Sequence, residues 1–499
     1  MKQGKVWLVG AGPSDAELLT LKAKRVLEEA DVVVYDALVG RAILSMIPSD
    51  VRCIDVGKRS GDHTMSQYKM NELLLEEAQK GNNVVRLKGG DPFLFGRGGE
   101  ELELLSKNNI AFEVVPGITS AISVPAYNGI PVTHRDYVSS LHIITGHKKA
   151  GEEYNIDFKA LVNTKGTLVF LMGIKALSDI AKGLMDAGMD PNMPAAVLSK
   201  GTTSRQKRIV ATLESLENKV NEIGIDPPGI IVVGKVCNLS NDFEWYEKLP
   251  LFGKSIIVTR PRDRASKMTA MLRKNGAEVL EIPSIKTIPM EENKEFEEAL
   301  KNVSQYNYIA FTSVIGVKVF FEKLKELRID VRDVKAYFAA IGSGTAKEIE
   351  KHGVLNSIMP KEFDGLHLGR EIGKHAKDTE KILIPRAKIG QSEIVEGIKE
   401  ESNAHIDDIA VYDTKYETNG IVDVAGEIEA GNIDYVCFTS ASTVKGFVEM
   451  VKLEDYSKVK ALCIGKQTEE AAKSFNMTTF VSKKATIDSL VELCIEMSQ

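Results

Sequence analysis

The chain has 499 residues, of which 43% are hydrophobic and 27% are charged. This balance is typical of a folded globular protein and excludes a disordered or fibrous chain, and the length predicts about three to four domains. The net charge of −6 argues against nucleic acid or an anionic membrane as a partner bound through bulk charge. No apolar run has the length of a membrane span.

The five cysteines are scattered and form no Cys-X-X-Cys pair. This pattern favours buried thiols of a reducing compartment over a disulfide framework or a zinc site. The first residues run directly into a predicted strand, with no cleaved signal visible. We therefore expect a cytoplasmic protein.

Short apolar strands alternate with helix-length amphipathic segments along the whole chain. Examples are KVWLVG, NVVRLKGG, TLVFLMG and GIIVVG, followed by KSIIVTR, YIAFTS, KILIPR and YVCFTS. This alternation predicts an α/β protein with largely parallel sheets. Residues 238–255 break the pattern with an aromatic cluster and Pro250, and we interpret them as the seam between two functional halves.

The first glycine motif, VGAGPSD at residues 9–15, follows a predicted strand and precedes a helix beginning near Leu18. Small residues let a ligand approach the backbone, and a helix N-terminus favours anions. A dinucleotide-binding fingerprint would need glycine at Asp15, and Pro13 removes a backbone donor. An acidic residue, Asp36, does lie about 20 residues further on, so a nicotinamide enzyme stays open as an alternative.

The second motif, RLKGGDPFLFGRGGEE at residues 86–101, is far more specific. Its glycines and arginines follow a predicted strand, Pro92 forces a turn, and Glu100 and Glu101 suit the first turn of a helix. Loops at the carboxyl ends of strands are where α/β proteins bind ligands. A purely structural turn would need fewer glycines, so the motif indicates a binding site.

Taken in order, these segments resemble the uroporphyrinogen-III C-methyltransferases of the tetrapyrrole methylase family. The resemblance covers residues 4–239 and includes VGAGP, VVYDALV, VGKRSGDH, RLKGGDPFLFGRGGEE, VVPGITSA, GIPVTHR, TGH, LVFLMG and PPGIIVVG. It implies two α/β domains around a cleft that binds S-adenosylmethionine. It also implies a small-molecule tetrapyrrole substrate and a homodimer formed through this half of the chain.

The resemblance also implies the site residues. Those that would contact the methyl donor are Pro13, Gly89, Gly90, Asp91, Leu94, Thr119, Ser120, Met172 and Gly201. The proton acceptor and donor fall on Asp36 and Lys58, since methylation of a pyrrole carbon needs positioning of the methyl group and later loss of a proton. Asp36 as a helix cap or as a substrate hydrogen-bond acceptor stays open. The substrate carboxylates would be bound by Lys58, Arg59, Arg97 and Arg135.

The second half contains an internal repeat. FTS recurs at residues 311–313 and 438–440, and IG recurs at residues 341–342 and 464–465, each where a strand should end. Order and spacing predict two related α/β units that face each other across a cleft. Taken singly, these Ser and Thr residues would be ordinary helix N-caps, and no metal-ligand spacing, nucleophile elbow or phosphate loop is present.

Residues 250–493 resemble uroporphyrinogen-III synthase in PLFGKSIIVTRP, IAFTSVIGVKVFF, AAIGSGTAKEI, IDDIAVYDTKY, DYVCFTSAST and CIGKQTEEA. The resemblance implies two flavodoxin-like lobes joined by a two-stranded ladder, and a reaction without a cofactor. Tyr412 would hold or protonate the leaving hydroxyl, with a structural role at the hinge as the alternative. The groups that would bind the substrate's acidic arms are Arg260, Thr312, Ser313, Gly342, Thr439 and Ser440.

We therefore predict a methylase with domains at 1–118 and 119–240, a linker at 241–253, one synthase lobe at 254–288 and 417–499, and a second lobe at 289–416. The predicted function is bifunctional: cyclisation of hydroxymethylbilane to uroporphyrinogen III with inversion of ring D, followed by two methylations that give precorrin-2. One alternative is a methylase of a later corrinoid intermediate. Another is a methyltransferase whose C-terminal half is a non-catalytic tetrapyrrole-binding module.

Overall fold

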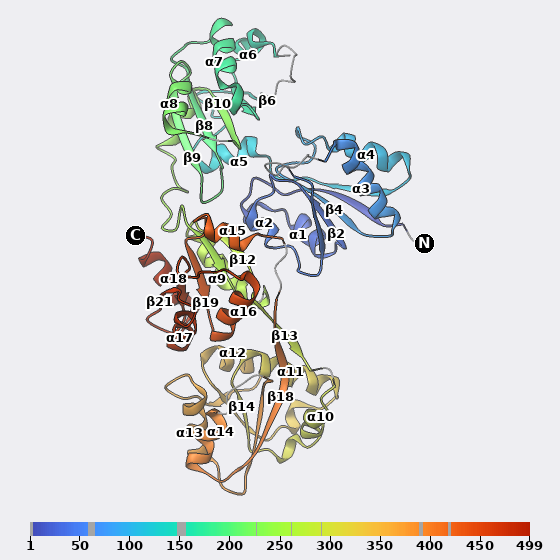
Figure 1. The fold of residues 1–499 in the computed structure, drawn as a ribbon, viewed down its shortest axis with the longest axis vertical. Helices are drawn as coiled ribbons and strands as arrows, with labels where there is room; N and C mark the ends of the chain where they lie inside the picture. The colour runs from blue at the N-terminus through green and yellow to red at the C-terminus, as the bar shows by residue number, and fades with distance from the viewer. Residues whose placement is uncertain are drawn as a thin grey trace. The chain divides into compact units, whose positions relative to one another are not determined.

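The computed structural model describes residues 3–57, 65–146, 156–225, 227–260, 262–290, 292–388, 393–417 and 421–499, with only the backbone described for 262–266. The chain divides into two compact units. One comprises Met1–Pro283 and Thr418–Gln499, and the other comprises Ser284–Glu417. The described residues form four β-sheets with helices on their faces (Figure 1).

The first sheet is entirely parallel, in the order β3-β2-β4-β1-β5. Its strands are β1 (Lys5–Gly10), β2 (Val32–Tyr35), β3 (Arg52–Asp55), β4 (Val84–Lys88) and β5 (Ala111–Val115). The helices are α1 (Leu21–Glu28), α2 (Arg41–Leu44), α3 (Gln67–Gln79) and α4 (Gly98–Lys107). The central strands β2 and β4 are buried along their whole length, as expected when helices cover both faces of a parallel sheet.

The second sheet has the order β6-β7-β10-β8-β9, and here the prediction of a largely parallel sheet is wrong. Only β6 and β7 pair in parallel, and the other three pairs are antiparallel. The strands are β6 (Leu141–Thr145), β7 (Thr167–Leu171), β8 (Pro194–Ser199), β9 (Lys207–Thr212) and β10 (Gly229–Val233). The turn from β8 to β9 is too short for a parallel crossover, so these two strands must run in opposite directions.

Four helices accompany the second sheet: α5 (Ser120–Tyr127), α6 (Phe158–Thr164), α7 (Leu177–Asp186) and α8 (Leu216–Ile223). The segment that follows is not a loose linker. The Trp245 indole Nε1 donates a 3.0 Å hydrogen bond to the Ala126 carbonyl, and Arg208 forms ion pairs of 3.1 Å with Glu244 and 3.0 Å with Glu247. The predicted seam is therefore packed onto the second domain.

The third sheet is parallel, in the order β12-β11-β19-β20-β21. Its strands are β11 (Ser255–Val258), β12 (Glu278–Glu281), β19 (Tyr435–Phe438), β20 (Lys460–Cys463) and β21 (Thr478–Val481). The helices are α9 (Arg262–Lys274), α15 (Val424–Glu429), α16 (Ala441–Val451), α17 (Lys466–Lys473) and α18 (Ile487–Glu496). The chain thus leaves this sheet after β12 and rejoins it at β19.

The fourth sheet makes up the second unit, in the order β13-β18-β17-β14-β15-β16. Its strands are β13 (Ile285–Pro289), β14 (Tyr308–Phe311), β15 (Tyr337–Ala340), β16 (Asn356–Ile358), β17 (Lys381–Ala387) and β18 (His405–Tyr416). Its helices are α10 (Lys294–Lys301), α11 (Val314–Glu326), α12 (Ser343–Lys351), α13 (Gly365–His375) and α14 (Glu393–Glu401). β13 and β18 form an antiparallel ladder at the point where the chain enters and leaves the unit.

The sheet orders confirm the internal repeat. In the fourth sheet β18-β17-β14-β15-β16 occupy the places that β12-β11-β19-β20-β21 occupy in the third. The repeated FTS follows β14 and β19, and the repeated IG follows β15 and β20. The two sheets are therefore related by a circular permutation of the chain. The strands equivalent to β11 and β12 are β17 and β18, which come last in the second unit, whereas β11 and β12 come first in the third sheet.

All five cysteines are free thiols, and four of them, Cys237, Cys437, Cys463 and Cys494, are buried. Burial raises the pKa of Cys237 to about 12, so its thiol stays protonated. The predicted pattern of buried, unpaired thiols is confirmed, although Cys53 is only half-buried. No helix among the described residues is long and apolar enough to cross a membrane.

Candidate functional site

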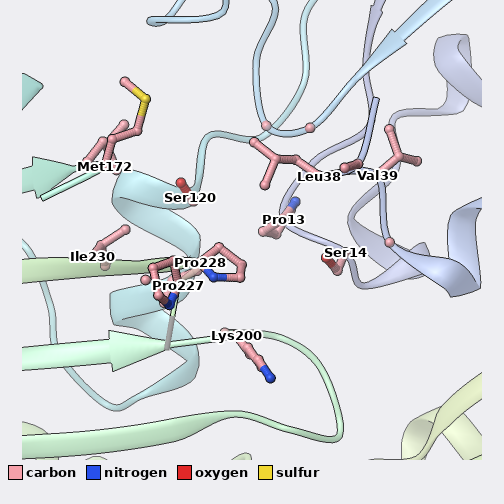
Figure 2. Close-up of a pocket in the computed structure, with 18 of the residues that line it drawn as sticks. Pro13, Ser14, Leu38, Val39, Ser120, Met172, Lys200, Pro227, Pro228 and Ile230 are labelled. Atoms are coloured by element: carbon pink, nitrogen blue, oxygen red, sulfur yellow. The ribbon is translucent and has the colours of Figure 1, made fainter. Parts of the chain in front are cut away.

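A cavity of about 1140 Å³ lies where strands of the first two sheets end. The segments after β1, β2 and β4 line it from the first sheet, and the segments after β7 and β8 line it from the second. Figure 2 shows Pro13 and Leu38 on one side, Met172 and Ile230 on the other, and Ser120 on α5 between them. The carboxyl ends of parallel strands are the usual ligand-binding edge of such sheets.

The cavity brings together most of the residues predicted for the first half. All nine predicted donor contacts line it, as do Asp36 and Arg97. Arg135 does not line the cavity and is exposed in the turn between His134 and Val138. Lys58 and Arg59 lie outside the described residues.

The glycines of the two motifs have different functions. Gly12 and Gly90 exchange backbone hydrogen bonds of 3.1 and 2.8 Å, which tie the loop after β1 to the loop after β4. A Cβ on Gly10 would lie 2.5 Å from the Gly117 Cα, and one on Gly117 would lie 2.2 Å from the Gly90 carbonyl oxygen. Gly10 and Gly117 are therefore required by backbone packing within the protein. For Gly10, the sequence had instead suggested the approach of a ligand.

Gly90 is the position where the backbone is open to a ligand. Its φ of +69° is in the left-handed region, and a Cβ built there would meet no atom within 4 Å. Because Gly90 also lines the cavity, the space beside its Cα is cavity space. A ligand can approach this stretch of main chain as closely as van der Waals contact allows.

Asp91 organises the loop around that glycine. Its Oδ1 accepts hydrogen bonds from the Phe93 and Leu94 amides at 2.8 and 3.1 Å, and its Oδ2 accepts one from the Gly117 amide at 3.1 Å. The side chain therefore joins the loops after β4 and β5. A ligand that reaches Asp91 meets a carboxylate whose position is already set by three backbone donors.

The second domain supplies an apolar wall and a helix end. Met172, which directly follows β7, has φ of +56°, is 53% exposed and lines the cavity (Figure 2). Thr119 is the N-cap of α5 and accepts a hydrogen bond from the Ala121 amide, and Ser120 is the first helical residue. At Gly201 a Cβ would lie 2.3 Å from the Val124 side chain, so the loop after β8 packs directly on α5.

Asp36 stands at the edge of the cavity in front of a buried arginine. Its Oδ1 accepts a 3.1 Å hydrogen bond from the Leu38 amide, and its Oδ2 accepts one of 3.3 Å from Arg86 Nη2. The guanidinium of Arg86 is 4% exposed, whereas the Asp36 side chain is 25% exposed. Arg86 therefore holds the Asp36 carboxylate on its buried side, and the carboxylate is accessible from the cavity on the other.

Arg86 belongs to a buried charge network on β4 and α4. Lys88 Nζ lies 2.5 Å from Glu101 Oε1, and Arg86 Nε lies 3.5 Å from the same oxygen. Burial and the neighbouring Arg86 lower the pKa of Lys88, and Glu101 offsets part of this effect. Lys88 lines the cavity and stands inside the RLKGGDP motif, but it was not among the residues predicted for the site.

Two further groups of cavity residues were missed. Pro227, Pro228 and Ile230 form part of the apolar wall, and they belong to the PPGIIVVG segment that was quoted only as a resemblance. Glu278, Glu427 and Asn432 come from the third sheet's domain. No sequence signal pointed to the second group, because nothing in local spacing relates these positions to residues of the first half.

The residues predicted for the second half fall in both units. In the second unit the Tyr412 hydroxyl donates a 2.9 Å hydrogen bond to Ser313 Oγ, and Ser313 caps α11 by accepting from the Gly316 amide. Tyr412 is 6% exposed and packs in the core beside Ile315. Thr312 and Gly342 follow the ends of β14 and β15. The structure thus brings Tyr412 and Ser313 together.

The other three predicted residues belong to the first unit. Thr439 and Ser440 follow β19, and Arg260 follows β11. Ser440 forms a capping box with Thr443 at the start of α16. The two repeated serines are therefore N-caps at equivalent places in the two sheets, as the alternative interpretation held.

Family models identify both halves of the chain. The model of the tetrapyrrole (corrin/porphyrin) methylases matches residues 5–217, and that of uroporphyrinogen-III synthase HemD matches residues 266–492. The porphyrin biosynthesis protein HemD of Ruminiclostridium josui is 45% identical over 498 residues, which is 100% of this chain and 99% of that protein. The chain belongs to the tetrapyrrole methylase and uroporphyrinogen-III synthase families.

Two further relatives match part of the chain. A uroporphyrinogen-III C-methyltransferase of Bacillus subtilis is 41% identical over 74% of this chain and 76% of its own length. An S-adenosyl-L-methionine-dependent uroporphyrinogen III methyltransferase of Methanosarcina barkeri is 52% identical over 47% of this chain and 93% of its own length. The predicted fold class, an α/β methylase followed by an α/β synthase, is confirmed.

Proposed function

We propose that this chain performs two consecutive steps of tetrapyrrole synthesis. The synthase half converts hydroxymethylbilane to uroporphyrinogen III. The methylase half then transfers two methyl groups from S-adenosylmethionine to give precorrin-2. The observation that carries the methylase proposal is the convergence of all nine predicted donor contacts on one cavity.

The cavity fits the methyl donor in size and chemistry. Leu94, Met172 and Ile230 offer apolar surface for an adenine ring, and the open backbone at Gly90 allows close approach of a ribose or amino-acid group. The hydroxyls of Thr119 and Ser120 lie at the start of α5 beside them. We therefore assign these side chains and the Gly89–Asp91 main chain to donor binding.

S-adenosylmethionine, when bound, supplies an electrophilic methyl group. The protein's own task is to hold the pyrrole carbon in line with that group and to accept the proton released afterwards. Asp36 is the acceptor that we propose, because its carboxylate faces the cavity and Arg86 holds it from behind. Arg97 binds a substrate carboxylate when it exchanges its ion pair with the exposed Glu100. Lys58, Arg59 and Arg135 remain proposals from the family resemblance.

In the synthase half, Tyr412 is the proposed acid or hydrogen-bond donor. Its hydroxyl is positioned by Ser313, so the phenol and the capping serine form one polar pair at the carboxyl end of β14. A tyrosine with a purely structural role would also have a buried, hydrogen-bonded hydroxyl like that of Tyr412. Measuring the two activities separately distinguishes these roles.

The function is tested by supplying the full chain with fresh hydroxymethylbilane and methyl-labelled S-adenosylmethionine under exclusion of oxygen. Two labelled methyl groups on a type III skeleton are the expected product. A type III macrocycle without label would contradict the methylase proposal. Only type I macrocycle, methylated or not, would mean that the C-terminal half is the non-catalytic binding module.

We further propose that the chain is a cytoplasmic homodimer that associates through the methylase half, with the domain limits given by the sequence. The apolar side chains of Phe112 and Ile122 in that half are 40% and 43% exposed, and we propose them as contacts with a second copy. Sedimentation equilibrium of the full chain against a Phe112→Lys, Ile122→Lys variant tests the dimer. Monomeric wild-type protein would contradict it.

A further inference from the structure

Part of the methylase cavity is built by the synthase half. Glu278, at the start of β12, and Glu427, on α15, both line the cavity although they belong to the third sheet's domain. Facing them from the methylase are Arg41, the first residue of α2, and Arg205, in the loop between β8 and β9. The synthase lobe therefore reaches the edge of the donor-binding space within one compact unit.

Glu278 contacts both methylase domains with a single carboxylate oxygen. Its Oε2 lies 3.1 Å from Nη2 of Arg41 in the first domain. The same oxygen accepts hydrogen bonds from Ser204 of the second domain, 2.5 Å from Oγ and 3.3 Å from the amide nitrogen. One side chain of the synthase thus joins the two walls of the methylase cavity.

This contact is largely shielded from water, and its one guanidinium lies between two carboxylates. The Glu278 side chain is 9% exposed and that of Arg41 is 23% exposed. Burial acts to lower the pKa of Arg41, but Glu278 and Glu427 outweigh it and raise the pKa, so the guanidinium stays charged between two carboxylates. Charge-assisted hydrogen bonds in such a place are stronger than those at an open surface.

Both loops that Glu278 holds also line the cavity, and the 200–206 loop carries Gly201, a predicted donor contact. The segment 36–41 includes Asp36 and Leu38, and the segment 200–206 includes Gly201 and Thr203, all of which line the cavity. α2 packs against β12, and one cluster of buried apolar side chains continues from Ile43 and Ile47 to Leu280 and Ile282. The lobe is thus seated on the methylase by apolar packing as well as by ions.

A second polar contact fixes the 200–206 loop to the same lobe. Arg205 Nη2 donates hydrogen bonds of 3.2 Å to the Gly431 carbonyl and 3.0 Å to Asn432 Oδ1. Within the methylase, the described hydrogen bonds between this loop and the first domain involve Thr202, whose Oγ1 donates to the Pro13 carbonyl at 2.9 Å and accepts from the Asp15 amide at 3.3 Å. The Tyr127 hydroxyl adds a 2.8 Å hydrogen bond from the second domain to Asp15 of the first, and the contacts with the synthase lobe supplement these.

We propose that Glu278 is a positioning residue for the methylase, through which the synthase lobe holds the 36–41 and 200–206 loops at the spacing that binds the methyl donor. The inference rests on the proposed S-adenosylmethionine-dependent methylation. The affinity of the methylase for its donor would then depend on the synthase lobe, because Glu278, which joins the two methylase loops, belongs to that lobe.

The test compares donor binding in full-length variants by calorimetry with S-adenosylmethionine. We expect Glu278→Ala to raise the dissociation constant about tenfold, a typical size for coupling between sites, and to raise the KM for the donor by a similar factor while kcat at saturation changes less than twofold. A role in folding alone would lower the melting temperature and the active fraction, and would leave Kd and KM unchanged.

Glu281→Ala is the matched control. Glu281 stands on the same strand and its carboxylate lies 3.5 Å from Arg273 of α9, inside the synthase lobe. It should bind the donor as the wild type does. Ser204→Ala removes the hydroxyl that donates to Glu278, and it serves as the test variant if Glu278→Ala does not fold. The double variant should bind the donor no more weakly than whichever single variant has the larger loss of affinity.

Three outcomes are decisive. Weakened donor binding in Glu278→Ala and Ser204→Ala, but not in Glu281→Ala, supports the proposal. Donor affinity in both of the first two variants equal to that of Glu281→Ala would overturn it. A wild-type chain that does not bind S-adenosylmethionine would overturn the proposed methylase function itself, and that result is seen before any variant is made.

Discussion

Asp36 is a single residue whose surroundings suit proton transfer. Its carboxylate is fixed by the Leu38 amide and by Arg86, and it faces the cavity. Arg86 is in turn close to Glu101, which also neutralises Lys88. Glu101 offsets one of these two buried cations and Asp36 pairs with Arg86, while the Asp36 carboxylate still lines the cavity, where a substrate proton can reach it.

Replacement of Asp36 by asparagine tests the base directly. Because the amide keeps the shape but cannot accept a proton, we expect the methylation kcat to fall at least about a hundredfold at neutral pH. Calorimetry should show unchanged affinity for S-adenosylmethionine, since Asp36 is not a predicted donor contact. Full turnover by the variant would exclude the base and favour the capping role.

Gly90 and Gly117 form a matched pair for separating ligand contact from packing. Gly90→Ala places a methyl group in open cavity space, so it should weaken donor binding about tenfold, with only about 1 kcal/mol of backbone strain. Gly117→Ala drives a Cβ to within 2.2 Å of a carbonyl oxygen and should destabilise the fold by about 1–3 kcal/mol. Urea unfolding and calorimetry check the two variants, and the opposite assignment of effects would refute this account.

At the scale of elements, the third and fourth sheets place related segments alike although the chain visits them in different order. FTS ends β14 and β19, and each is followed by a capped helix, α11 or α16. The fourth sheet then gains β13, which pairs antiparallel with the last part of β18. The added ladder forms where the chain passes into and out of the second unit.

Helices α13 and α14 pack through glycines. A Cβ on Gly397 would lie 2.3 Å from the Leu366 carbonyl oxygen, and one on Gly369 would lie 2.2 Å from the Ile394 carbonyl oxygen. The backbones of the two helices therefore touch, which only small residues allow. This close packing covers one face of the fourth sheet with buried Leu368, Ile372, Ile394 and Ile398.

Gly397→Ala should therefore destabilise the second unit by about 1–3 kcal/mol, because the added methyl group forces the helices apart. Gly344→Ala is the control in the same unit. It lies in α12 with no atom within 4 Å of a built Cβ, so it should leave stability unchanged or raise it by up to about 1 kcal/mol. Urea unfolding of the two variants tests this contrast, and equal effects would contradict the packing argument.

At the scale of the whole molecule, the synthase candidates Tyr412 and Ser313 and the methylase cavity belong to different compact units. Among the described residues, each cluster of buried apolar side chains lies within one unit. The two activities should accordingly respond separately to substitutions inside the second unit.

Tyr412→Phe is expected to lower the synthase rate at least about tenfold, since the variant loses the hydroxyl and nothing else. Methylation of supplied uroporphyrinogen III should stay intact. Synthase rate is measured by isomer analysis of the macrocycle, and methylation by transfer of label. A parallel loss of both activities would show that the substitution acts through the fold.

Much of the site could be predicted because its parts are contiguous in sequence. Gly89, Gly90 and Asp91 directly follow a strand, and the loop after a parallel strand lies at the ligand-binding edge whatever else the fold does. The two halves and the repeat were likewise visible, since strand and helix periodicities are local properties. The sequence alone thus determined the fold class, both families and a set of predicted donor contacts that all line one cavity.

Only the tertiary structure decided which distant residues meet. The antiparallel order of the second sheet follows from how β10 inserts between β7 and β8, which no local pattern encodes. The contact between Gly10 and Gly117 is of the same kind. So are the contacts of Glu278, which is 237 residues from Arg41 and 74 residues from Ser204 in the sequence. Such pairs share no periodicity or spacing, because what brings them together is the burial of whole sheets against one another rather than any preference of the residues themselves.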